Sequence, residues 1–205
     1  MLRIMHIEEI EDLLLLLPTL VQQQEQRSAD FAPNAGAWLI SLEKVFTANR
    51  LYQAGFIATL RSGLVAVEQG QIPAGLEFRG RPTRSKVLNA VASQALQRTA
   101  EVTSTLIAEN RPRLVEAERV AQQIVAVALS RGLITARETE VGITQYLQML
   151  RRNLVTSGDL ESAVVHLEGL VGPHDTLVLL DRALVPYLDI ISPTMHSGMF
   201  PPPGK

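Results

Sequence analysis

Residues 35–70 read AGAWLISLEKVFTANRLYQAGFIATLRSGLVAVEQG, and this stretch carries the clearest periodic pattern in the sequence. The residues that recur at steps of three and four are Trp38, Leu42, Val45, Asn49, Tyr52, Phe56, Leu60, Gly63 and Val67. Because an α-helix has about 3.6 residues per turn, this spacing keeps all of them on one helix face. The pattern predicts one long central helix, or two nearly collinear helices, over 35–70.

The segments on either side show the same helical periodicity. Further helices are predicted over 6–27 with a kink or split at Pro18, over 84–109, from Asn110 to Gly132 with Pro112 in the first turn, and from about 135, 157 and 175 onward. Aromatic residues make up only 4% of the chain, which favours helix packing over a β-sandwich or barrel. The predicted fold is all-α, a bundle of about six or seven helices.

The length of 205 residues suits one domain. From Ser192 the chain reads SPTMHSGMFPPPGK, which is rich in proline and glycine and is typical of an irregular segment. We therefore predict a single helical domain over 1–191 and an irregular tail over 192–205.

The composition excludes several classes of protein. The absence of cysteine rules out disulfides, thiolate metal sites and cysteine nucleophiles, and fits a cytoplasmic location. The leucine run at 13–17 is short and follows acidic residues, so we do not read it as a signal peptide. No apolar run is long enough to span a membrane, and the net charge of −2 implies no general attraction to nucleic acid.

A basic cluster marks the start of the helix predicted over 84–109. Arg79, Arg81, Arg84 and Lys86 lie within eight residues, in a glycine-containing loop that leads into a helix N-terminus. Unpaired N–H groups at such a terminus favour an anion, and arginine adds bidentate contacts to phosphate or carboxylate. The cluster predicts an anion-binding junction. The alternatives are a solvated turn or salt bridges to the acidic first helix.

A second possible site lies where polar residues interrupt the central stripe. Asn49 and Arg50 indicate a helix junction or a surface-facing pair, or else a polar pair held inside the bundle. With Arg98 they would form a buried polar cluster in a pocket between helices. No His-Glu-x-x-His or Gly-x-Ser-x-Gly motif is present. The sequence therefore predicts no catalytic residue, metal site or cofactor.

The leading function expected from these observations is a non-enzymatic helical interaction or assembly protein. The apolar faces of the predicted helices are wider than a helix needs to pack on one side, especially in the helix predicted from Asn110. This surplus of apolar surface favours self-association or binding to a partner protein. The alternative is anion or nucleic-acid binding through the basic junction, although the near-neutral charge does not favour nucleic acid. A helical enzyme with a pocket between helices is a third possibility.

Overall fold

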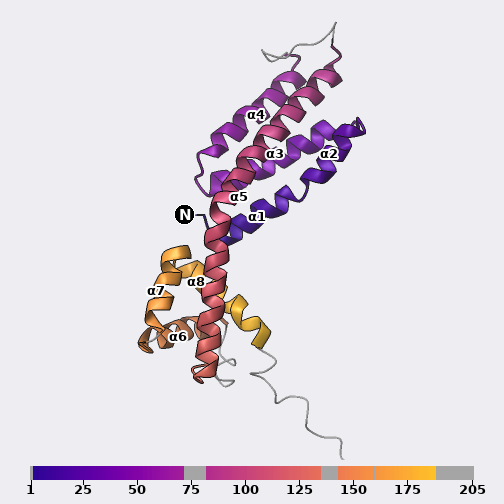
Figure 1. The fold of residues 1–205 in the computed structure, drawn as a ribbon. Helices are drawn as coiled ribbons and strands as arrows, with labels where there is room; N and C mark the ends of the chain where they lie inside the picture. The colour runs from indigo at the N-terminus through magenta and orange to yellow at the C-terminus, as the bar shows by residue number, and fades with distance from the viewer. Residues whose placement is uncertain (1, 72–81, 135–142, 159, 188–205) are drawn as a thin grey trace, which may run out of the picture. The chain divides into compact units, whose positions relative to one another are not determined.

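The computed structural model describes residues 2–71, 82–134, 143–158 and 160–187. Within these ranges all regular secondary structure is helical (Figure 1), which confirms the all-α prediction. None of the helices in these ranges is long and apolar enough to cross a lipid bilayer. The chain divides into two compact units, Leu2–Arg111 and Pro112–Lys205. The single domain over 1–191 stays a prediction, and the tail predicted over 192–205 lies outside the described residues.

The first unit consists of α1 (Ile4–Leu14), α2 (Leu17–Glu25), α3 (Phe31–Ala48), α4 (Gln53–Glu68) and the first part of α5 (Arg84–Ser130). The predicted first helix is split between α1 and α2 at Leu15 and Leu16. Pro18 explains the split, because it lacks the N–H that would bond to the carbonyl of Leu14 in a continuous helix. Helix α3 packs against α1, α2 and α4 and supplies much of the buried core.

The central segment is a helical hairpin, so the prediction of one long helix or two collinear helices over 35–70 is wrong. The chain turns at 49–52, where Arg50 has a positive φ of 54° and Leu51 N donates to Phe46 O at 2.9 Å. Glu43 on α3 and Arg61 on α4 form an ion pair at 2.6 Å. Because these two residues lie at similar distances before and after the turn, α3 and α4 are antiparallel.

The periodic stripe continues through this turn because both helices of the hairpin bury one face in the same core. Leu42, Val45 and Val67 are buried as the stripe predicts, whereas the side chain of Tyr52 is 89% exposed. Periodicity records which face of a helix is apolar, but not whether the helix axis reverses between two segments. The tyrosine lies in the turn, where the three-to-four spacing has no structural meaning.

Helix α5 joins two segments that were predicted to be separate helices. It runs unbroken from Arg84 to Ser130 with Pro112 inside it. Asn110 does not cap a new helix; its Nδ2 donates instead to the carbonyl of Leu106 at 2.8 Å. A proline removes one helical hydrogen bond without stopping a helix whose remaining turns are held by packing. The two compact units meet along the chain between Arg111 and Pro112.

The second unit contains the rest of α5, then α6 (Ile143–Thr156), α7 (Glu161–Val171), α8 (Pro173–Leu184) and the 3₁₀ helix η2 (Val185–Tyr187). Gly132, with a φ of 65°, follows α5 and confirms the predicted end of that helix. Gly172, with a φ of 83°, separates α7 from α8 as the Gly-Pro pair predicts. The core of this unit is aliphatic and includes Leu150, Leu154, Val164, Leu167 and Leu180.

The proline inside α5 provides a test of this helix. We expect Pro112→Ala to raise the free energy of unfolding by about 1–3 kcal/mol, because alanine restores the N–H that the carbonyl of Ala108 lacks. Chemical denaturation followed by far-ultraviolet circular dichroism measures the change. Pro33→Ala is the matched control and should be nearly neutral, because Pro33 lies in the first turn of α3, where no helical acceptor is available. Equal or lower stability of Pro112→Ala would contradict a continuous α5.

Candidate functional site

The structure describes half of the predicted basic junction. Arg79 and Arg81 lie outside the described residues. Nη2 of Arg84 donates to the carbonyl of Glu68 at the end of α4, where a cation is favoured by the helix dipole. Lys86 is exposed, and its main-chain N–H donates to Thr83 Oγ1 at 3.3 Å, so Thr83 caps α5. Arg84 therefore connects two helices and is already hydrogen-bonded to one of them.

The predicted buried polar cluster is not formed. Arg50 and Arg98 are both exposed, and Asn49 is half-buried with its Nδ2 donating to the carbonyl of Val45 at 2.8 Å. The reason is the hairpin turn, which carries Asn49 and Arg50 to the end of α3 rather than into the core. The carbonyl of Val45 thus accepts both the main-chain N–H of Asn49, at 3.1 Å, and its side-chain amide.

The histidines are dispersed. Among the described residues, no three His, Asp or Glu side chains are grouped closely enough to hold a metal ion. His6 Nδ1 lies 3.7 Å from a carboxylate oxygen of Glu9, His166 and His174 are exposed, and His196 lies outside the described residues.

The most distinctive surface feature of the first unit is a hollow beside the only tryptophan. We call it the Trp38 groove; it has a volume of about 300 Å³ and is lined by Leu13, Leu16, Thr19, Leu20, Gln23, Asn34, Ala37, Trp38 and Ser41. The side chain of Trp38 is 3% exposed. Its Nε1 donates to the carbonyl of Leu13 at 2.7 Å, at the end of α1. This bond joins α1 to α3, and both of its residues line the groove.

A second hydrogen bond links two residues that line the groove. Asn34 Nδ2, on the first turn of α3, donates to Gln23 Oε1 on α2 at 3.0 Å. Two contacts between α3 and the segments that precede it therefore hold the walls of the groove. Its shape is set by the fold and does not depend on a bound molecule.

Large apolar side chains are exposed in the segment that supplies one wall of the Trp38 groove. The exposed fraction is 74% for Leu15, 50% for Leu16 and 42% for Val21. The first two form the break between α1 and α2, and the third lies on α2. Single exposed leucines are ordinary on protein surfaces, but adjacent ones beside an apolar hollow are typical of binding surfaces.

The outer face of α3 carries another hollow, of about 600 Å³, which is lined by Ile40, Glu43, Lys44, Thr47, Ala48 and Arg61. Ile40 is 42% exposed. The ion pair between Glu43 and Arg61 forms part of its wall, and the hydrogen bond within this pair raises the pKa of Arg61. Since Ile40 and Ser41 are neighbours on α3, the two hollows flank one exposed strip of this helix.

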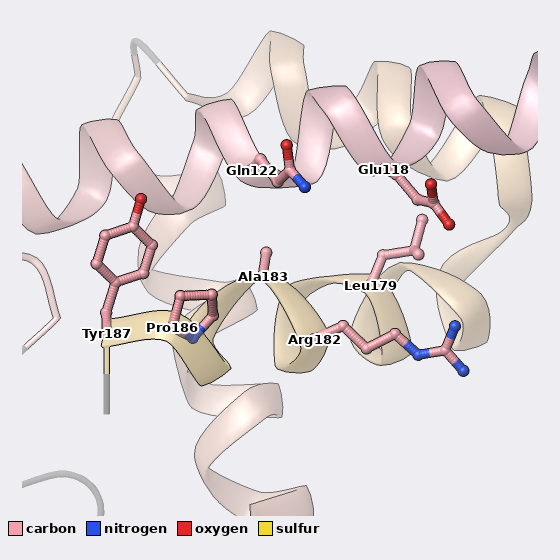
Figure 2. Close-up of a pocket in the computed structure, with 7 residues that line it drawn as sticks. All are labelled: Glu118, Gln122, Leu179, Arg182, Ala183, Pro186 and Tyr187. Atoms are coloured by element: carbon pink, nitrogen blue, oxygen red, sulfur yellow. The ribbon is translucent and has the colours of Figure 1, made fainter. Parts of the chain in front are cut away.

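The second unit contains a cavity of about 340 Å³ between α5 and the α8–η2 segment. Figure 2 shows Glu118 and Gln122 on α5 above Leu179 and Ala183 on α8, with Tyr187 at one end. Arg182 and Pro186 complete the lining. One acid and one base line the cavity, so it has no clear charge preference.

A smaller cavity of about 260 Å³ lies between α6 and the start of α8, lined by Gln148, Arg151, Arg152, Pro173, His174 and Leu177. Arg151 is already paired with Glu168 on α7, and this hydrogen bond raises the pKa of the arginine. Asp175 is buried at the third position of α8, where its carboxylate offsets the positive helix end. The ion pair with Glu168 thus engages one of the two arginines that line this cavity.

Comparisons of the chain with protein-family models, with curated proteins and with solved structures find no match. The conclusions on function therefore rest on the chain's own residues.

Sequence reasoning did not identify the Trp38 groove. Trp38 was expected to lie on the core face, and its burial agrees with that prediction. The leucine run at 13–17 contains the signal for the exposed patch, because Pro18 follows it at once and a helix break leaves side chains without a packing partner. The groove itself depends on how α1 and α2 meet α3, which periodicity does not specify.

The hydrogen bond of Trp38 can be tested by substitution. We expect Trp38→Phe to lower the free energy of unfolding by about 1–2 kcal/mol, because most of the ring packing remains while the bond to Leu13 is lost. Urea denaturation followed by circular dichroism measures this. Ser41→Ala at the groove rim is the control and should change stability little, since its hydroxyl bonds only within α3. Wild-type stability of Trp38→Phe would show that the bond contributes nothing.

Proposed function

We propose that this protein is a non-enzymatic helical assembly protein that self-associates through the α2–α3 face of its first unit. The observation that carries the proposal is the pair of exposed leucines, Leu15 and Leu16, beside the preformed Trp38 groove. Fully burying a leucine or valine side chain contributes about 1.5–3 kcal/mol, so covering this surface is favourable.

The exposed apolar patch of Leu15, Leu16 and Val21 is too small to form a stable interface by itself. Leu15, Leu16 and Val21 are only partly exposed, and their burial alone does not offset the cost of association, which is about 4–15 kcal/mol. Stable interfaces bury about 800 Å² on each partner. The interface that we propose therefore extends across α3 to Ile40 and the second hollow.

Self-association is preferred to a different partner because the patch is complementary to itself. It supplies the exposed Leu15 and a hollow that is lined in part by Leu16, within one unit. A two-fold symmetric dimer places the same patch of both subunits in contact, so Leu15 of each copy can pack against the groove of the other.

Anion or nucleic-acid binding through the basic junction has less support. Arg84 is hydrogen-bonded to the end of α4, and Arg79 and Arg81 lie outside the described residues. The third possibility is an enzyme with a pocket between helices. It has less support because Arg50 and Arg98, which were predicted to lie in that pocket, are exposed.

The proposal is tested by light scattering on the full chain after size-exclusion chromatography. We expect a mass that is a multiple of the 22.5 kDa chain, and the mass of a single chain for the double variant Leu15→Gln/Leu16→Gln. Both side chains are exposed, so the helix content should be unchanged by circular dichroism. The polar substitutions act by making burial of the patch unfavourable.

The matched control is Val165→Gln, which replaces a 59% exposed apolar residue on α7 and should keep the wild-type mass. A wild-type protein with the mass of one chain at every concentration would contradict self-association. An oligomer that the double variant leaves intact would place the interface elsewhere.

A further inference from the structure

The middle of α5 turns polar side chains toward the core of the first unit. Between Leu96 and Leu106, the buried residues of α5 are Thr99 and Thr103, and both are 0% exposed. They lie about one turn apart, so they share one face of the helix. Over roughly three turns, α5 therefore contributes hydroxyl groups to the core instead of large apolar side chains.

Neither of these two hydroxyls is paired. In the part of the chain that the structure describes, Oγ1 of Thr99 and Oγ1 of Thr103 have no hydrogen-bond partner. A threonine in a helix can donate to the carbonyl four residues before it, as Thr105 does to Glu101 at 2.9 Å. Buried polar groups without a partner are rare in folded proteins, and each one destabilises the packed state relative to a hydrated one.

A third unpaired oxygen lies on α4, next to the same part of α5. The side chain of Gln53 is 8% exposed, and its Oε1 is buried without a partner among the described residues. Gln53 lines a small hollow together with Val102 and Leu106 of α5. The first turn of α4 therefore lies against the two turns of α5 that carry Thr103.

Helix α4 lies beside α5 along the whole of this polar stretch (Figure 1). At the other end of the contact, a Cβ added at Gly63 would lie 3.6 Å from Cγ1 of Val91. Residue numbers thus rise along α4 while they fall along α5, so the two helices are antiparallel. Thr99 and Thr103 lie between the two points of contact, at Val91 and Leu106. We call Gln53, Thr99 and Thr103 the polar layer.

The contacts of α3 are of a different kind. Large side chains that are 0–1% exposed fill its core face, namely Phe31, Leu39, Leu42 and Phe46. The hydrogen bond of Trp38 ties α3 to α1, and the ion pair between Glu43 and Arg61 ties it to α4. Buried apolar area and paired polar groups both stabilise such contacts. We therefore expect α5 to separate from the unit at a lower free energy than α3 does.

We propose that the polar layer is an opening device, through which the part of α5 from Arg84 to Leu106 separates reversibly from α4 without unfolding of α3. Water hydrates the three oxygens when the helices part, so the layer lowers the free energy of the open state relative to the packed state. The open state uncovers Val91 on α5 and Ile57 on α4. The α2–α3 face is not changed, so this proposal and the assembly proposal do not depend on each other.

The test measures opening by the reactivity of an introduced thiol, since the chain has no cysteine of its own. Ala95→Cys places the thiol on the core face of α5, and Ala35→Cys is the matched control on α3; the two alanines are 1% and 0% exposed. A buried thiol reacts with Ellman's reagent only while its site is open. We expect Ala95→Cys to be labelled at least about tenfold faster, and equal rates would overturn the proposal.

The contribution of the hydroxyls is tested in the Ala95→Cys background. Thr99→Val and Thr103→Val should each slow the labelling by about tenfold, because each removes an unpaired buried hydroxyl at nearly constant shape. Thr105→Val is the control; its hydroxyl is exposed and bonded within α5, and valine has a similar helix propensity, so the rate should be unchanged. Unchanged or faster labelling in both buried variants, or equal slowing by Thr105→Val, would overturn the proposal.

Gln53→Met tests the α4 side of the polar layer. It should slow the labelling of Ala95→Cys as the threonine variants do, because it replaces an unpaired buried amide with an apolar side chain of similar size. Faster labelling would show that the amide stabilises the packed state, and would overturn the device. Circular dichroism checks that each variant keeps the wild-type helix content. If Ala95→Cys loses helix content, Ala92→Cys takes its place, since Ala92 is 0% exposed on the same helix.

Discussion

The hydrogen bond from the indole of Trp38 to the carbonyl of Leu13 is the contact on which the surface of the first unit depends. A buried indole N–H needs an acceptor, and the carbonyls near the end of a helix are the ones left without helical donors. Pro18 ensures that α1 ends there, because it cannot continue the hydrogen-bond ladder. Once α1 is tied to α3 at this point, Leu15 and Leu16 lie between two helices with no core to enter. The groove and the exposed leucines thus have one common cause.

Much of the fold could be predicted from local signals in the sequence. The break near Pro18, the cap at Thr83 and the end of α5 at Gly132 follow from residue chemistry that acts within one or two turns. The hairpin at 49–52 could not be predicted in this way. Arg50 adopts a positive φ there, although glycine or asparagine is the usual residue. The polar residues Asn49 and Arg50 indicated a helix junction as one alternative, but the three-to-four spacing continued across them, so no local signal showed that the chain reverses direction.

At Pro112 the sequence predicted the start of a new helix, whereas the structure has one continuous helix. An Asn-x-Pro sequence is typical of a helix start, yet Asn110 and Pro112 lie inside α5. Tertiary packing on both sides of the proline holds the helix together and overrides the local preference. The same limit applies to the sites. The Trp38 groove brings residues 13–23 against residues 34–41, and the three-to-four spacing within each segment does not specify how the two segments meet.

Hydrogen–deuterium exchange at a low and a high protein concentration would test most directly whether the α2–α3 face is the surface through which copies of this chain meet. Helix α2 is short and largely exposed, so its amides should exchange readily when it is uncovered. We expect peptides that span residues 15–23 and 37–44 to exchange more slowly at high concentration, with α7 unchanged. Exchange over 15–23 that is the same at both concentrations, in a protein that light scattering shows to be oligomeric, would contradict this interface.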